Sequence, residues 1–123
     1  PRRLGESRTA VDPVIFTYGI EAIARDSTYH PVDDWSYTED GKVVKVTIAT
    51  TDDDAYPSGW RYALHYGTID GETVLRYDNA HEETKGHEKH AGDTVEQIDF
   101  PGMTALYERF LETIREDFDD LPR

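Results

Sequence analysis

The stretch "WRYALHYGTIDGETVLRYDNA" (residues 60–80) decides the fold. Apolar and polar residues alternate in both of its halves, with the two-residue period of a half-buried strand. Asp70-Gly71 lies between the halves, and this dipeptide is typical of a two-residue type I′ hairpin turn. The stretch therefore predicts a β-hairpin of two antiparallel strands.

The turn also predicts which residues face each other across the hairpin. The predicted pairs are Ile69–Glu72, Tyr66–Leu75, His65–Arg76, Leu64–Tyr77 and Ala63–Asp78. In this register the residues of one face are apolar: Trp60, Tyr62, Leu64, Tyr66, Leu75 and Tyr77. The residues of the opposite face are Arg61, His65, Arg76 and Asp78. A slip of one residue would mix the two faces, so their agreement supports the register.

Further elements are expected on both sides of the hairpin. "KVVKVTIAT" (42–50) alternates as a strand does, and a short strand is expected at 94–98. After "FPG" (100–102), apolar residues recur at helical spacing and form one stripe: Met103, Leu106, Tyr107, Phe110, Leu111, Ile114 and Phe118. Such a stripe predicts a C-terminal helix packed on the sheet.

The N-terminal part carries weaker signals. Asp12-Pro13 suits a helix start, with Asp as the N-cap and Pro at the first helical position, and the helix would run to Arg25. A strand over 14–18 is the alternative. Flexible residues are expected at 1–12, and loops at 26–41, 51–59 and 79–92.

These elements predict one α+β domain over residues 1–123. Its antiparallel sheet would have three to five strands packed against the C-terminal helix, and 123 residues can bury a real core. The chain has no cysteine, which excludes disulfides and thiolate metal sites. No run of about 18 apolar residues is present, so we expect no membrane span and a cytoplasmic protein.

The chain is strongly acidic. It has 26 Asp and Glu against 13 Lys and Arg, of which only four are Lys, and its formal net charge is -13. Such a composition suits the cytoplasm of a halophile; the alternative is an acidic domain with a basic partner. At molar salt the Debye length is only about 3 Å. Local clusters of cations, rather than the net charge, would then decide whether phosphate binds.

One such cluster is "RYDNAHEETKGHEKH" (76–90), which holds three of the five histidines. Three chemistries stay open for it. The first is metal-free RNA cleavage, in which histidines transfer protons and cations hold the phosphate. The second is a metal site, for example for zinc, made by Asp78, His81, His87 and His90. The third is no chemistry, with the loop's glutamates paired to Lys and Arg.

For RNA cleavage the sequence offers a definite set of candidates. The proton-transfer candidates are His81, His87 and His90, and Asp78 would orient them. The phosphate-binding candidates are Arg76, Lys89, Arg61 and His65.

The same cluster resembles a known family. "RYDNAH", a Lys-Gly spacer and "HEKHAG" resemble the TumE-like toxins of prokaryotic toxin–antitoxin systems. The resemblance covers about residues 42–118, and "IDFPGMTALYERF" (98–110) is similar to haloarchaeal members. The positions that match the family signature are Tyr77, Asp78, Asn79, His87 and His90. His81, the acidic "EET" spacer and Glu88 depart from it.

The resemblance implies a toxin with a cognate antitoxin, often a helix-turn-helix protein. It makes ribonuclease activity, with RNA as a partner, the leading expectation, and a homo-oligomer is possible. The alternative is a non-catalytic binding module whose His-rich loop binds a metal or a protein.

Overall fold

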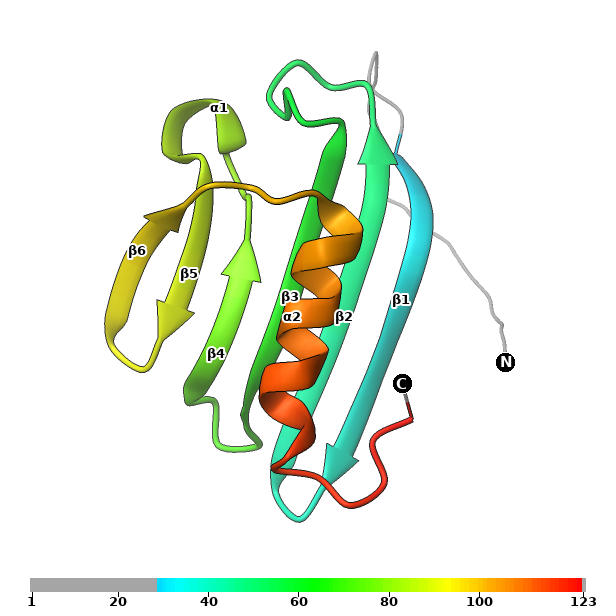
Figure 1. The fold of residues 1–123 in the computed structure, drawn as a ribbon, viewed down its shortest axis with the longest axis vertical. Coiled ribbons are helices and arrows are strands. Elements are labelled where there is room, and N and C mark those ends of the chain that lie inside the picture. The colour runs from blue at the N-terminus through cyan, green and yellow to red at the C-terminus, as the bar shows by residue number, and fades with distance from the viewer. Residues whose placement is uncertain (1–28, 123) are drawn as a thin grey trace.

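The computed structural model describes residues 29–122, which form a six-stranded antiparallel sheet and two helices. The strands follow one another across the sheet in chain order, and the longer helix lies on one face (Figure 1). The elements are β1 (Tyr29–Glu39), β2 (Lys42–Thr51), β3 (Trp60–Thr68), β4 (Thr73–Asp78), α1 (Glu82–Lys85), β5 (His87–Ala91), β6 (Thr94–Ile98) and α2 (Met103–Arg115). The expectations for residues 1–25 lie outside the described residues.

The predicted α+β class is confirmed, but three to five strands was too few. Two segments expected as loops contain strands: 26–41 contains β1, and 79–92 contains β5. β1 is an edge strand, where Pro31 is tolerated beside a register shift. β5 reads His-Glu-Lys-His-Ala, so it has no apolar alternation to reveal it. The predicted strands at 42–50 and 94–98 are confirmed as β2 and β6.

The tight hairpin turn forms at a different Asp-Gly from the predicted one. Asp40 and Gly41 both have positive φ, 51° and 80°, and join β1 directly to β2. At Asp70-Gly71 only the glycine has positive φ, and the Gly71 N–H donates to the Thr68 carbonyl. The pairing shifts by one residue after Tyr66, and the predicted Ile69–Glu72 pair is wrong.

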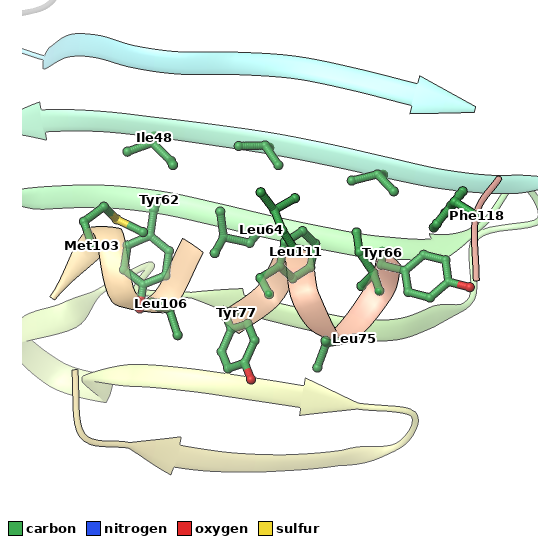
Figure 2. Packing of buried hydrophobic residues seen from close by; sticks show 14 residues of the cluster. Ile48, Tyr62, Leu64, Tyr66, Leu75, Tyr77, Met103, Leu106, Leu111 and Phe118 are labelled. Atoms are coloured by element: carbon green, nitrogen blue, oxygen red, sulfur yellow. The ribbon is translucent and has the colours of Figure 1, made fainter. Parts of the chain in front are cut away.

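The rest of the hairpin register is confirmed, and it separates the two faces of the sheet as predicted. The apolar face packs against α2, and Trp60 is the only partly buried member of its predicted set. Figure 2 shows the resulting core between the sheet and α2. Tyr77 in this core packs edge to face against Phe110, with ring centroids 6.4 Å apart. Leu64 and Phe110 are fully buried, and burial of each such side chain stabilises the fold by about 1.5–3 kcal/mol.

The opposite face of the sheet, turned away from α2, we call the polar face. Its charged and histidine side chains from β2 to β5 are Lys45, Arg61, His65, Arg76, Asp78, Glu88 and His90. The predicted set Arg61, His65, Arg76 and Asp78 is therefore confirmed as lying on one face. No helix of the described part is long and apolar enough to cross a membrane.

Gly67 is the tightest glycine of the described residues. A Cβ there would lie 2.2 Å from the Glu72 carbonyl oxygen and 2.9 Å from His65 Nε2. We expect Gly67→Ala to lower the free energy of unfolding by at least about 2 kcal/mol, measured by urea denaturation. Gly92→Ala is the control, because open space surrounds Gly92 and only its positive φ would cost about 1 kcal/mol. Equal costs for the two variants would contradict this packing.

Candidate functional site

Strand β5 divides the histidine cluster between the two faces of the sheet. Neighbouring residues of a strand point to opposite faces, so His87 and Lys89 lie on the α2 side, whereas Glu88 and His90 lie on the polar face. The sequence had placed His87 and His90 in one loop. The structure instead gives each histidine its own set of partners.

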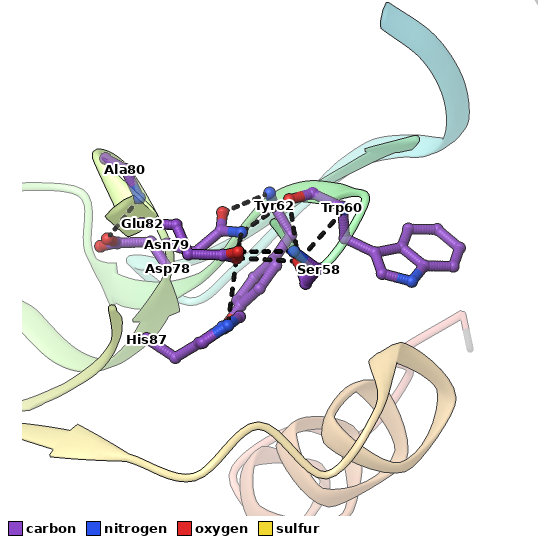
Figure 3. Close-up of polar contacts among 8 residues, drawn as sticks. All are labelled: Ser58, Trp60, Tyr62, Asp78, Asn79, Ala80, Glu82 and His87. Atoms are coloured by element: carbon purple, nitrogen blue, oxygen red, sulfur yellow. Dashed lines mark hydrogen bonds and ion pairs between the residues drawn. The ribbon is translucent and has the colours of Figure 1, made fainter. Parts of the chain in front are cut away.

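On the α2 side, Asn79 and Glu82 form the centre of a buried polar network (Figure 3). The Asn79 amide accepts from the Tyr62 N–H at 3.0 Å and donates to the Trp60 carbonyl at 2.6 Å. Asn79 also donates to Glu82 Oε1 at 2.9 Å. The Glu82 carboxylate accepts in addition from the backbone N–H and the hydroxyl of Ser58, each at 2.8 Å. The network therefore ties the end of β4 to the start of β3.

His87 completes this network. Its Nε2 lies 3.1 Å from Glu82 Oε1, and its Nδ1 lies 2.8 Å from the Tyr62 hydroxyl. Its ring stacks on Phe100 with centroids 4.3 Å apart. Burial lowers the pKa of His87, although the Glu82 charge opposes this. A neutral imidazole that donates from Nε2 to Glu82 and accepts the Tyr62 hydroxyl proton satisfies both contacts.

The charge of Glu82 is held by its hydrogen bonds. Burial raises the pKa of Glu82, but the hydrogen bonds from Ser58 and Asn79 outweigh this and lower it overall. A buried carboxylate is stable only when such donors replace its water. Asn79, Glu82 and His87 therefore hold the loop after β4 in place, and both nitrogens of His87 already have partners.

On the polar face, Asp78 is the centre of a second cluster. Arg76 Nε donates to Asp78 Oδ2 at 2.9 Å, and His90 Nε2 lies 3.4 Å from the same oxygen. His90 Nε2 also lies 3.3 Å from Glu88 Oε1. These are ion-pair distances, but His90 Nε2 makes no hydrogen bond and is shielded from solvent. The cluster thus holds His90 Nε2 between the carboxylates of Asp78 and Glu88.

Three strands align a further histidine with this cluster. His65 pairs with Arg76 across β3 and β4, and Arg76 pairs with His90 across β4 and β5. The three side chains therefore form one row, with Arg76 in the middle. Burial and the charge of Arg76 lower the pKa of His65, and its Nδ1 has no hydrogen-bond partner. The row therefore has one imidazole on each side of the Arg76 guanidinium.

The remaining predicted site residues lie elsewhere. Lys89 is on the α2 side, paired with Tyr77, and Tyr77 itself belongs to the core. His81 is exposed at the start of α1 with φ 60°, and its carbonyl accepts from Thr84 and Lys85. Arg61 is exposed on the polar face, where its guanidinium lies 5.3 Å from the Tyr29 ring centroid.

Two groups of site residues are visible only in the structure. Glu88 joins Asp78 around His90, and no sequence pattern indicates this because the residues of β5 fall in the predicted loop 79–92. A pocket of about 250 Å³ opens beside the cluster, and its lining includes Tyr29, Thr47, Ala49, Arg61, Ala63, Arg76 and Asp78. Aligning the predicted strand 42–50 with the hairpin could have revealed its small residues.

Among the described residues, Asp78, Glu88 and His90 of the polar-face cluster are grouped closely enough to hold a metal ion. One ligand atom of each lies within 4.8 Å of the others. The donor types fit a divalent cation, but Arg76 donates to Asp78 Oδ2 and adds a positive charge beside the set. His81 and His87, which the predicted metal set included, are not part of this group.

The model of the toxin TumE family matches residues 11–118. The chain belongs to this family. The match confirms the resemblance to the TumE-like toxins, and it extends further towards the N-terminus than the expected 42–118. No curated protein and no solved structure is significantly similar to the chain. Membership of this toxin family implies an antitoxin partner.

We expect Asn79→Ala in this TumE-family toxin to lower the free energy of unfolding by at least about 2 kcal/mol, because the Tyr62 N–H and the Glu82 carboxylate would lose a buried partner. Chemical denaturation measures the change. Thr84→Ala is the control, because Thr84 is exposed and bonds only the His81 carbonyl. A loss of no more than that of the control would refute the structural role of Asn79.

His87 predicts how stability depends on pH. Its pKa in the folded protein is lowered from the ordinary 6.5, so the unfolded chain takes up the proton first on acidification. Stability should therefore be full above about pH 6.5 and fall as the pH drops towards the folded pKa. Urea unfolding at constant salt measures this slope, which His87→Gln should reduce and His30→Gln, at an exposed position, should keep. A wild-type stability that rises on acidification through this window would contradict the assignment.

Proposed function

We propose that this toxin cleaves RNA without a metal ion, at the row His65–Arg76–His90 on the polar face. The observation that carries the proposal is the register of three neighbouring strands, which puts the three side chains side by side. With strands about 4.8 Å apart, the Cα atoms of the two histidines are about 10 Å apart. That span leaves room for a phosphodiester over Arg76.

Cleavage needs a base on one side of the phosphate and an acid on the other. The neutral His65 imidazole takes the proton of a ribose 2′-hydroxyl, and the 2′-oxygen bonds to phosphorus. The bond from phosphorus to the 5′-oxygen breaks, and the His90 imidazolium gives that oxygen its proton. The products are a 2′,3′-cyclic phosphate and a 5′-hydroxyl. Arg76 stabilises the negative charge on the phosphoryl oxygens during the step.

The electrostatics of the row suit this division of roles. The lowered pKa of His65, caused first by burial and then by Arg76, keeps a lone pair available at neutral pH. His90 Nε2 instead lies 3.4 and 3.3 Å from carboxylate oxygens of Asp78 and Glu88, within ion-pair distance of both. His65, a phosphate-binding candidate from the sequence, is the general base in this proposal.

The proposal leaves other predicted residues without a catalytic part. His87 has both ring nitrogens bonded, and Lys89 lies on the α2 side. Arg76 and Arg61 remain the cations for RNA on the polar face. The halophilic, archaeal and cytoplasmic setting, a helix-turn-helix antitoxin and a homo-oligomer stay predictions.

The second candidate is a non-catalytic module that binds a divalent metal such as zinc. The grouping of Asp78, Glu88 and His90 favours it. The two functions differ in cleavage itself: the non-catalytic module binds zinc and cuts no RNA, whereas the proposed toxin cuts RNA and should continue to do so in EDTA. Cleavage that stops in EDTA and returns with zinc would replace the proposed mechanism with a metal-dependent one.

The catalytic row is tested by paired substitutions. We expect His90→Ala and His65→Ala to lower RNA cleavage by at least about 100-fold, because each removes one proton-transfer step. Growth arrest in a host of matched salt should vanish in parallel. The measurement combines a cleavage assay on purified protein with growth and total RNA after induction, while the thermal midpoint reports folding.

Two cations on neighbouring strands provide a matched control. Arg76 and Lys89 are both part of the β4–β5 pairing but face opposite sides of the sheet. Arg76→Ala should abolish cleavage, whereas Lys89→Ala should retain it. Equal losses for both variants, or full cleavage by folded His90→Ala, would refute the proposed site.

A further inference from the structure

The pocket on the polar face lies directly beside the proposed catalytic row. Arg76 and Asp78 line it and also belong to the cluster around His90. Its volume of about 250 Å³ lies below the range of pockets for drug-sized ligands. A bound group in it would therefore be small and would sit next to the phosphate over Arg76.

Small side chains make the pocket accessible to a flat group. Ala49 of β2 pairs with Arg61 of β3, and Thr47 of β2 pairs with Ala63 of β3. All four lie on the polar face, where long side chains would otherwise cover the backbone. Ala49, Ala63 and Thr47 have short side chains, so the sheet surface is low beside Arg61 and a planar ring can approach it closely.

The pocket lining includes one aromatic and one cationic side chain that contact each other, Tyr29 and Arg61. The Arg61 guanidinium lies 5.3 Å from the ring centroid of Tyr29 and 5.9 Å from that of Tyr56. The Tyr29 hydroxyl donates to Asp53 at 2.9 Å, which fixes the ring. Tyrosine rings and arginine planes are the surfaces on which unpaired nucleobases stack.

Asp78 adds a hydrogen-bond acceptor to the pocket. Its Oδ2 accepts from Arg76, and its Oδ1 accepts from the Ala80 N–H at a long 3.3 Å. A carboxylate oxygen has two lone pairs, so Oδ1 can also accept from an N–H of a base.

We infer that this pocket binds one unpaired nucleobase of a single-stranded RNA, beside the phosphate that is cut. The inference rests on the proposed function and names its substrate class. The bases of an A-form duplex are paired and stacked within the helix, and a duplex cannot deliver one into the pocket without opening. The toxin should therefore select single strands.

Binding of an uncleavable strand tests the pocket apart from catalysis. We use a short, mixed-sequence 2′-deoxy oligonucleotide, which has bases and phosphates but no 2′-hydroxyl to attack, and measure its affinity by fluorescence anisotropy at fixed salt. The single strand should bind at least about tenfold more tightly than its blunt duplex. Equal affinity, or no binding of the single strand, would overturn the inference.

Variants of the pocket locate the binding. Ala49→Leu fills the pocket and should weaken single-strand binding by about tenfold. Thr38→Leu should leave it unchanged, because Thr38 is exposed on the same face of β1 and does not line the pocket. Tyr29→Ala, on the exposed edge strand, is a second variant that removes a stacking ring without adding bulk, and it should also weaken binding. Unchanged affinity in both folded pocket variants would refute the site.

The two proposals fail in distinguishable ways. Lys89→Ala should retain binding of the deoxy strand, since Lys89 lies on the α2 side and does not line the pocket. If folded His90→Ala still cuts RNA while Ala49→Leu weakens binding, the catalytic proposal fails and the base pocket stands. If His90→Ala stops cleavage but Ala49→Leu binds as the wild type does, the base pocket fails and the catalytic row stands.

Discussion

The pairing of β4 with its two neighbouring strands is the constraint on which the rest of the structure depends. β4 is only six residues long, yet it pairs with β3 on one side and with β5 on the other. Its alternate residues supply Leu75 and Tyr77 to the core and Arg76 and Asp78 to the polar face. A one-residue slip would exchange these pairs and put a charged pair under α2. Burial of the apolar pair therefore holds the polar pair in position.

The polar network around Asn79 is what allows so polar a segment to follow β4. The segment from Asn79 to His90 is almost devoid of apolar residues, so burial alone cannot hold it. Asn79 and Glu82 instead satisfy the backbone of Tyr62 and Ser58 and accept His87 as a further partner. The direction in which β5 leaves this network decides that His90 faces Asp78. Structural and proposed catalytic histidines thus lie three residues apart in one short strand.

Much of the fold could be predicted because apolar residues recur along the sequence with the period of a strand or a helix. The strand over 42–50, the hairpin and α2 each show an apolar face, and their register follows from it. β5 could not be predicted, because His87 and Lys89 are no more apolar than Glu88 and His90. The same limit applies to the site. The hairpin register alone predicts that His65, Arg76 and Asp78 share one face. The separation of His87 from His90 needed the pairing of β5 with β4.

The acidity of the chain and its proposed affinity for RNA are compatible because they act over different distances. The net charge of -13 acts over the whole surface and is screened by salt over a Debye length of about 8 Å at 0.15 M and about 3 Å at 1 M. The charge of Arg76 would act on a bound phosphate at contact distance, with no water or salt between the two groups. Asp78 accepts from its Nε and so fixes the guanidinium, whose other N–H groups remain the donors that a phosphate requires. An acidic neighbour at this position offsets part of the cation's charge while it orients the remaining donors of the guanidinium.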